Sequence, residues 1–261
     1  MRLANKAKPC VTVDMSFKDH FSTQAATYAK ARPTYPPALF AELARLAPGT
    51  ALAWDCGSGN GQAAVALAAH FERVVATEPS AAQLAQAVAH PRVRYVQSAE
   101  LAPGIADGSA DIVTAAQAAH WFDLKIFYPE VRRVLRPGGL LAIWNYGLWT
   151  IEPTVDALVE RFYNGTVGPY WPPERKHAET SYRLLEFPFP EIPLPKLNLE
   201  VDWTAEEFAT YLRTWSAVAR YIKAHGTDPV TAFEPELSKA WGGDRRRIVW
   251  PVGGRLARVD G

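Results

Sequence analysis

The stretch that decides the fold runs from Ala51 to Gln62 and reads ALAWDCGSGNGQ. An apolar run ends at the acidic Asp55, three glycines follow at alternate positions, and an alanine-rich run begins at Gln62. A strand, a glycine-rich turn and a helix in this order form the first unit of a doubly wound α/β fold. Ligands of such folds lie over the carboxyl ends of the strands. Because glycine has no Cβ, a ligand can approach the backbone of this turn closely.

The spacing of the glycines bears on the kind of ligand. A dinucleotide fingerprint has the pattern G-x-G-x-x-G, and Gln62 stands where its third glycine would be. The order Asp55-x-Gly57-x-Gly59-x-Gly61 instead resembles motif I of the class I S-adenosylmethionine methyltransferases. That cofactor has no pyrophosphate, and its amino-acid moiety needs exposed backbone groups and a nearby carboxylate. Binding of NAD or FAD, and a turn that holds no ligand, remain the alternatives.

Three further segments carry the same resemblance: YAKARPTYP at 28–36, AQAAHWFD at 116–123 and VLRPGGLL at 134–141. On these motifs the chain is identified as a member of the methyltransferase type 11 group, in its trans-aconitate methyltransferase-like branch. The motifs cover residues 17–146, and the remainder agrees only in general pattern. The resemblance implies an α/β fold with a doubly wound, mostly parallel seven-stranded sheet and a cap insertion before the last strand.

A second carboxylate follows the second β-rich run. Arg73 to Glu78 is short and apolar and ends in acid, and Glu78 lies 23 residues after Asp55. An acidic side chain about 20 residues beyond the glycine turn can accept hydrogen bonds from ribose hydroxyls. Since nicotinamide and S-adenosylmethionine enzymes share this need, Glu78 indicates a nucleoside ligand without choosing between them.

The resemblance implies a set of cofactor-binding positions on the loops that follow the strands. S-adenosylmethionine, with S-adenosylhomocysteine as its product, is the cofactor expected there. The expected contacts are Tyr28, Arg32, Asp55, Gly57, Ser58, Gly59, Gly61, Glu78, Pro79, Ser98, Ala99, Glu100 and Gln117.

The acceptor is expected at the same edge of the sheet. His120 follows the fourth strand, residues 110–115, and is the candidate catalytic residue, acting as a base or by positioning the substrate. The expected substrate contacts around it are Trp121, Trp144, Tyr146 and Trp149. The six histidines are scattered, so no metal site is expected, and the absence of a G-x-S-x-G motif argues against a common hydrolase.

Four regions are expected along the chain. Residues 1–14 form a flexible tail, 15–36 a flap, 37–146 the cofactor-binding core, and 147–261 the cap with the final strands. Within the core, a helix is expected from Ser80 to Ala89. In the last region the sequence predicts a strand at 197–203 and helices at 205–215, 216–224 and 229–241. A last strand or hairpin at 246–259 is expected to break near Pro251 and Gly253-Gly254.

Composition bounds the function. The chain has 261 residues, 48% of them hydrophobic, with a net charge of +1 and only two cysteines. These values indicate a globular protein whose main partner is not nucleic acid, without a disulfide framework. No apolar run reaches the ~18 residues of a membrane span, and a cytoplasmic monomer or homodimer is expected.

The sequence therefore predicts a methyltransferase that acts on a small molecule, possibly a carboxylic acid. A Rossmann-type oxidoreductase and a non-catalytic S-adenosylmethionine-binding protein remain the alternatives. The former would need the glycine that Gln62 replaces, and the latter would keep the glycine turn but lose the acceptor pocket.

Overall fold

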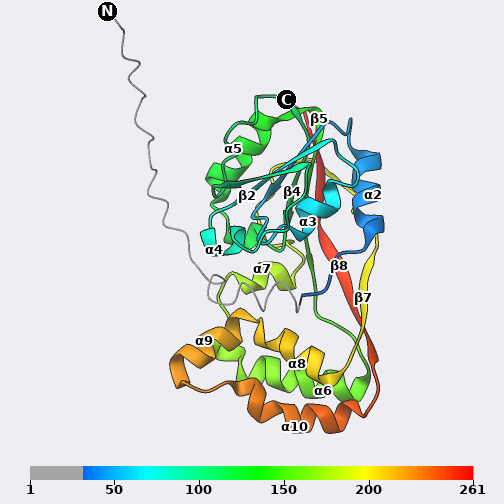
Figure 1. The fold of residues 1–261 in the computed structure, drawn as a ribbon, viewed down its shortest axis with the longest axis vertical. Coiled ribbons are helices and arrows are strands. Elements are labelled where there is room, and N and C mark those ends of the chain that lie inside the picture. The colour runs from blue at the N-terminus through cyan, green and yellow to red at the C-terminus, as the bar shows by residue number, and fades with distance from the viewer. Residues whose placement is uncertain (1–31, 261) are drawn as a thin grey trace, which may run out of the picture.

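The computed structural model describes residues 32–260. The predicted tail, most of the predicted flap and Tyr28 lie outside the described residues. The described chain has an α/β part and a helical cap below it, joined by the long strand β8 (Figure 1).

The sheet has the strand order β3-β2-β1-β4-β5-β8-β6. The first five strands in chain order run parallel: β1 (Leu52–Cys56), β2 (Arg73–Glu78), β3 (Val93–Gln97), β4 (Ala110–Ala116) and β5 (Leu135–Tyr146). Strand β8 (Arg246–Val259) runs antiparallel to β5. The chain winds outward in opposite directions from β1 and β4, and the crevice at such a switch point is where doubly wound sheets bind ligands.

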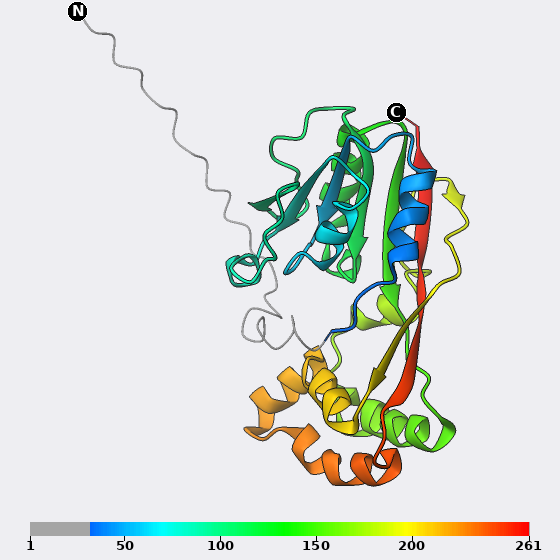
Figure 2. The ribbon, with the colours of Figure 1, turned by 45° about the vertical axis from the view of Figure 1, so that its right-hand side comes forward.

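Each face of the sheet packs into its own hydrophobic cluster, because alternate strand residues point to opposite sides. Ala53 of β1 faces α2 (Pro37–Leu46) and α3 (Gln62–Leu67), whereas its neighbour Trp54 faces α5 (Leu124–Val134). Figure 2 shows α2 on one side of the sheet and α5 on the other. The fold class expected from the sequence is confirmed.

Three details differ from the sequence-based expectation. The described residues contain eight strands rather than seven, because β6 (Glu191–Ile192) and β7 (Asn198–Trp203) both pair with β8. Strand β8 is continuous across Pro251 and is not a hairpin. Helix α4 (Ala81–Leu84) is much shorter than the expected Ser80–Ala89, although Ser80 caps it by accepting from the Gln83 amide at 3.2 Å.

The cap is built from the chain between β5 and β8. Its helices are α6 (Pro153–Arg161), α7 (Arg175–Glu179), α8 (Ala205–Arg213), α9 (Ser216–His225) and α10 (Pro229–Trp241), with short turns at Phe162–Thr166 and Gly168–Tyr170. Aromatic rings fill its interior, among them Trp149 stacked on Trp215 and Phe162 stacked on Phe233. In Figures 1 and 2, α7 lies between the sheet and the other cap helices.

Candidate functional site

The glycine turn after β1 combines left-handed backbone with tight packing. Gly57, Gly59 and Gly61 have φ angles of 67°, 56° and 89°. A Cβ on Gly57 would lie 2.6 Å from the Ala118 Cβ, and one on Gly61 would lie 2.0 Å from the Tyr95 hydroxyl. At Gly59 the nearest atom would be 3.9 Å away, on the Gln83 side chain. Glycine at 57 and 61 therefore makes room for neighbouring protein groups, and Gly59 is the one of the three with open space beside it.

Glu78 holds the glycine turn against β2. Its carboxylate accepts hydrogen bonds from the amides of Gly59, at 3.0 Å, and Ser80, at 2.9 Å, and the residue is 8% exposed. The acid that the sequence assigns to the ribose thus lies at the turn, as its spacing predicts. The ribose contact itself stays a prediction.

Asp55 is wholly buried at the end of β1. The Thr114 hydroxyl donates to its Oδ1 at 2.7 Å, and within residues 32–260 its Oδ2 makes no hydrogen bond of normal geometry. Burial raises the pKa of Asp55 to about 7; the Thr114 hydroxyl opposes this rise, and the negative charge of Glu78 adds to it. A buried carboxylate with an unpaired oxygen beside a glycine turn fits a cofactor that carries a positive charge.

The loop after β3 lies against the same edge of the sheet. The Ser98 amide donates to the Glu78 carbonyl at 3.2 Å, and the Pro79 carbonyl accepts from the Gln97 side chain at 3.1 Å. Ala99 is buried, and the Glu100 carboxylate accepts from the Asp123 amide at 3.0 Å. The structure thus brings these predicted cofactor positions beside the glycine turn.

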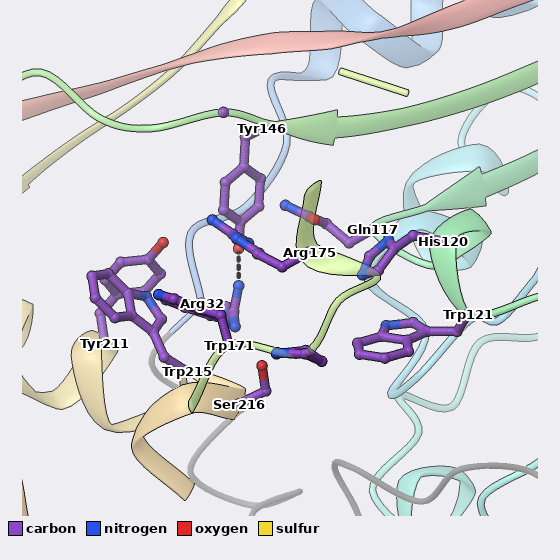
Figure 3. Close-up of a pocket in the computed structure, with 12 residues that line it drawn as sticks. Arg32, Gln117, His120, Trp121, Tyr146, Trp171, Arg175, Tyr211, Trp215 and Ser216 are labelled. Atoms are coloured by element: carbon purple, nitrogen blue, oxygen red, sulfur yellow. Dashed lines mark hydrogen bonds between the residues drawn. The ribbon is translucent and has the colours of Figure 1, made fainter. Parts of the chain in front are cut away.

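A pocket opens between this edge and the cap (Figure 3). It is lined by Arg32, Gln117, His120, Trp121, Tyr146, Gly147, Trp171, Pro172, Arg175, Tyr211, Trp215 and Ser216. In Figure 3, Gln117, His120 and Trp121 project from the sheet side, and Tyr211, Trp215 and Ser216 come from the cap.

Gln117 and His120 come from the turn that follows β4. Gln117 has a φ of 57°, a left-handed conformation that is uncommon for a residue with a side chain, and its amide donates to the Trp144 carbonyl at 2.8 Å. His120 lies in the short turn Ala119–Trp121. Its Nδ1 is 3.1 Å from the hydroxyl of the buried Tyr182, and its ring contacts that of Trp121.

The charge of the pocket wall comes from arginine. Arg32 donates to the Tyr146 hydroxyl at 2.6 Å and to the Thr214 carbonyl at 3.3 Å. Arg175, on α7, lies over the ring of Trp171, with 4.7 Å between the guanidinium carbon and the ring centroid. The described residues that line the pocket include no aspartate or glutamate.

Two of the predicted substrate contacts lie elsewhere. Trp144 is completely buried against Phe40 of α2, because its position on β5 points to the α2 face of the sheet. Trp149 packs inside the cap, 5.4 Å from Trp215 between ring centroids. Neither lines the pocket, whereas Tyr146 and Trp121 do.

Sequence reasoning missed several pocket residues. Trp171, Trp215, Arg175 and Tyr211 line the pocket, and none of them was among the expected site residues. The concentration of tryptophans after residue 143 is the signal that pointed to this region.

Two negative findings concern residues 32–260. No group of three or more histidine, cysteine, aspartate or glutamate side chains in this range could hold a metal ion. None of the helices in this part of the chain is long and apolar enough to cross a membrane.

Comparison with known proteins identifies the family. A Dictyostelium discoideum protein named as a methyltransferase is 37% identical over 229 residues, which are 86% of this chain and 87% of the relative. The chain belongs to the class I S-adenosylmethionine methyltransferases. The family pattern described as a methyltransferase domain matches residues 54–143 of this methyltransferase.

Two further similarities agree with this assignment. A solved structure from Anaeromyxobacter dehalogenans, described as a type II methyltransferase, is 47% identical with a TM-score of 0.81, covering 87% of this chain and 97% of that one. A Saccharomyces cerevisiae protein named as S-adenosylmethionine-dependent is 30% identical over 132 residues, 47% of this methyltransferase and 45% of the relative.

The family assignment confirms S-adenosylmethionine as the cofactor of this methyltransferase. The described residues fit it, because the buried carboxyl group of Asp55, the carboxylate of Glu78 and the open side of Gly59 lie at one sheet edge. The assignment to the trans-aconitate-like branch stays a prediction.

Proposed function

We propose that this methyltransferase transfers a methyl group from S-adenosylmethionine to a carboxylate oxygen of a small organic acid. The observation that carries the proposal is the pocket between the sheet edge and the cap. Two guanidinium groups line it, from Arg32 and Arg175, and among residues 32–260 no acidic side chain does. A wall of this charge favours an anionic acceptor and disfavours an amine, which is cationic at neutral pH.

The cofactor is held by the loops at the carboxyl ends of β1 and β2. Bound there, it supplies an electrophilic methyl carbon on a sulfonium sulfur. Glu78 would accept hydrogen bonds from the ribose, and Asp55 in its ionised form would face the cationic amino-acid end. The amides that Glu78 holds in the native turn, those of Gly59 and Ser80, keep this carboxylate in place.

Methylation of a carboxylate requires no proton transfer by the protein. A carboxylic acid with a pKa near 4 is already ionised at pH 7. Its oxygen forms the new bond to the methyl carbon while the carbon–sulfur bond breaks and its electron pair stays on sulfur. The products are a methyl ester and a neutral thioether, and no proton moves. Gln117, His120 and Trp121 then act by orienting the acid and excluding water.

A second candidate acceptor is a hydroxyl group, and one contact favours it. His120 Nδ1 lies 3.1 Å from the Tyr182 hydroxyl, and a proton on Nδ1 would make Nε2 the basic nitrogen of the ring. This arrangement would make His120 a general base, a role that a carboxylate acceptor does not require.

The deciding experiment incubates the full chain with S-adenosylmethionine labelled in its methyl group and a panel of acids, phenols and amines. Mass spectrometry identifies the labelled product. We expect methyl esters. Methyl ethers as the only products would favour a hydroxyl acceptor. Methylated amines as the only products would contradict the inference that the arginines select an anionic acceptor. Cofactor binding without any turnover across the panel would indicate a non-catalytic binding protein.

A further inference from the structure

The two arginines of the pocket have different surroundings. Arg32 donates one hydrogen bond to Tyr146 and another to the Thr214 carbonyl, and its guanidinium lies over the ring of Tyr211 at 5.4 Å. These contacts link the end of β5 to the cap. Arg32 is therefore engaged in joining two parts of the protein as well as lining the pocket.

The Arg175 side chain is oriented by a hydrogen bond from Nε and by aromatic rings that pack on its guanidinium. Its Nε donates to the Tyr163 hydroxyl at 3.0 Å, and its guanidinium lies over the rings of Trp171 and Tyr163 at 4.7 and 5.7 Å. Within residues 32–260 its two terminal nitrogens, Nη1 and Nη2, donate no hydrogen bond to the protein. An arginine fixed in this way presents two parallel donors, the arrangement that matches a carboxylate.

A buried tyrosine fixes that orientation. The Tyr163 hydroxyl accepts from Arg175 and donates to the Glu179 carboxylate, and burial raises the pKa of Tyr163 so that the hydroxyl keeps its proton at neutral pH. Glu179 lies on the Nε side of Arg175, 3.6 Å from that nitrogen, and does not line the pocket. The charge of Glu179 therefore balances that of Arg175 on the Nε side, and Glu179 does not occupy the terminal nitrogens.

A carboxylate that accepts hydrogen bonds from both terminal nitrogens of an arginine is a poor nucleophile. Its lone pairs lie in charge-assisted hydrogen bonds, which stabilise the anion and would have to be given up as the oxygen attacks carbon. The group that Arg175 holds and the group that is methylated should therefore differ.

We propose that Arg175 determines acceptor specificity by anchoring an anionic group of the acceptor other than the one that is methylated. This rests on the proposed function. The acceptor then carries two acidic groups, and its flat or apolar body lies among the rings of Trp171, Trp215 and Trp121. The product is a monoester that keeps one negative charge.

The test uses matched acids that differ by one carboxylate: hexanoate with adipate, and benzoate with terephthalate. Binding is measured by calorimetry in the presence of S-adenosylhomocysteine, and KM and kcat are measured separately by methyl transfer. We expect the wild-type protein to bind each diacid at least about tenfold more tightly than its monoacid. In Arg175→Gln this preference should disappear, with the diacid KM raised about 10- to 100-fold and the monoacid KM unchanged.

Three variants separate anchoring from a general loss of structure. Tyr163→Phe keeps the charge but releases Nε, so the diacid KM should rise while kcat holds. Arg175→Lys keeps the charge without the paired donors and should restore only part of the preference. Arg161→Gln removes an exposed cap arginine paired with Glu236 and should change the KM of neither the monoacid nor the diacid.

The outcomes distinguish this inference from the proposed function. Methyl esters formed with equal KM for monoacids and diacids, or a diacid preference that survives in Arg175→Gln, would overturn the anchor and leave the function standing. Absence of any ester would reject the function. In that case calorimetry still decides the anchor, which fails if the wild-type protein binds no diacid more tightly than its monoacid.

Discussion

Replacing Asp55 by asparagine measures the effect of burying a carboxylate at the end of β1. Burial raises the pKa of Asp55 from 3.8 to about 7. The folded state therefore binds this proton more tightly than the unfolded chain does. The free energy of unfolding should consequently fall as the pH rises from about 4 to about 7, and no further change from this group is expected above that range. Asparagine stays neutral and keeps an oxygen that can accept from Thr114, so it should lack this dependence.

The magnitude follows from the two pKa values. A difference of 7 − 3.8 corresponds to about 4 kcal/mol of lost stability when the group is fully ionised. At pH 5 roughly 1.5–2 kcal/mol of this has been lost, and at pH 8.5 nearly all of it. The stability difference between Asp55→Asn and the wild type should therefore shift in favour of the variant by about 2.5 kcal/mol between these pH values.

Urea unfolding followed by tryptophan fluorescence, at pH 5 and at pH 8.5, gives this difference for each protein. The exposed Asp244→Asn serves as the control and should track the wild type at both pH values. A stability difference for Asp55→Asn that is the same at pH 5 and pH 8.5 would show that burial does not hold this carboxylate protonated, and the account of its pKa would be wrong.

The glycine turn and the pocket give three further expectations. Glu78→Ala should weaken S-adenosylmethionine binding about 10- to 100-fold in calorimetry, whereas Glu72→Ala, at an exposed position, should not. Equal affinities of Glu78→Ala and the wild type would contradict the predicted ribose contact. Gly57→Ala should destabilise the fold by about 1–3 kcal/mol more than Gly59→Ala in urea unfolding, because only the former meets a neighbouring Cβ; equal losses would contradict the packing argument. His120→Ala should raise KM for an acid acceptor and leave kcat unchanged; a fall in kcat of about 10²–10⁴ would assign His120 as a base.

Local sequence patterns were enough to predict most of the fold. The strands β2, β4 and β7 and the helices α8, α9 and α10 lie within a few residues of the expected ranges, because each has a continuous apolar pattern of the appropriate period. The helix expected from Ser80 to Ala89 is longer than α4, because the alanine-rich sequence continues beyond Leu84, where the helix ends in the structure.

Strand β8 shows how tertiary context overrides residues that usually break a strand. Pro251, which lacks an amide proton, lies where β8 passes from pairing with β7 to pairing with β5. A Cβ on Gly254 would lie 2.2 Å from the Ile143 carbonyl oxygen, so glycine there permits the close approach of β5. Gly254 is required by the close approach of β5, and the sequence of β8 alone does not contain that information.

The candidate site was predictable where it follows the strands and unpredictable where the cap supplies it. His120 and Tyr146 could be placed because the ends of parallel strands meet at one edge. Trp144 points to the same side of the sheet as Tyr146 but lies two residues before the end of β5, where Phe40 of α2 covers it, and spacing alone did not predict that cover. Arg175 lies on a short helix without periodicity, and its position depends on a hydrogen bond from Asn145 of β5 to the Ala178 carbonyl, a contact between distant segments.

The passage of β8 through both parts of the molecule has a consequence for folding kinetics. Its pairing with β7, from Arg246 opposite Trp203, closes a much shorter loop than its pairing with β5, from Val252 opposite Tyr146. Because loop-closure entropy grows with the length of chain enclosed, we expect the β7–β8 ribbon to form first. Folding of the cap then shortens the effective loop between β5 and the rest of β8. The core sheet would thus gain its antiparallel strand late, and substitutions in the β5–β8 pairing should mainly accelerate unfolding.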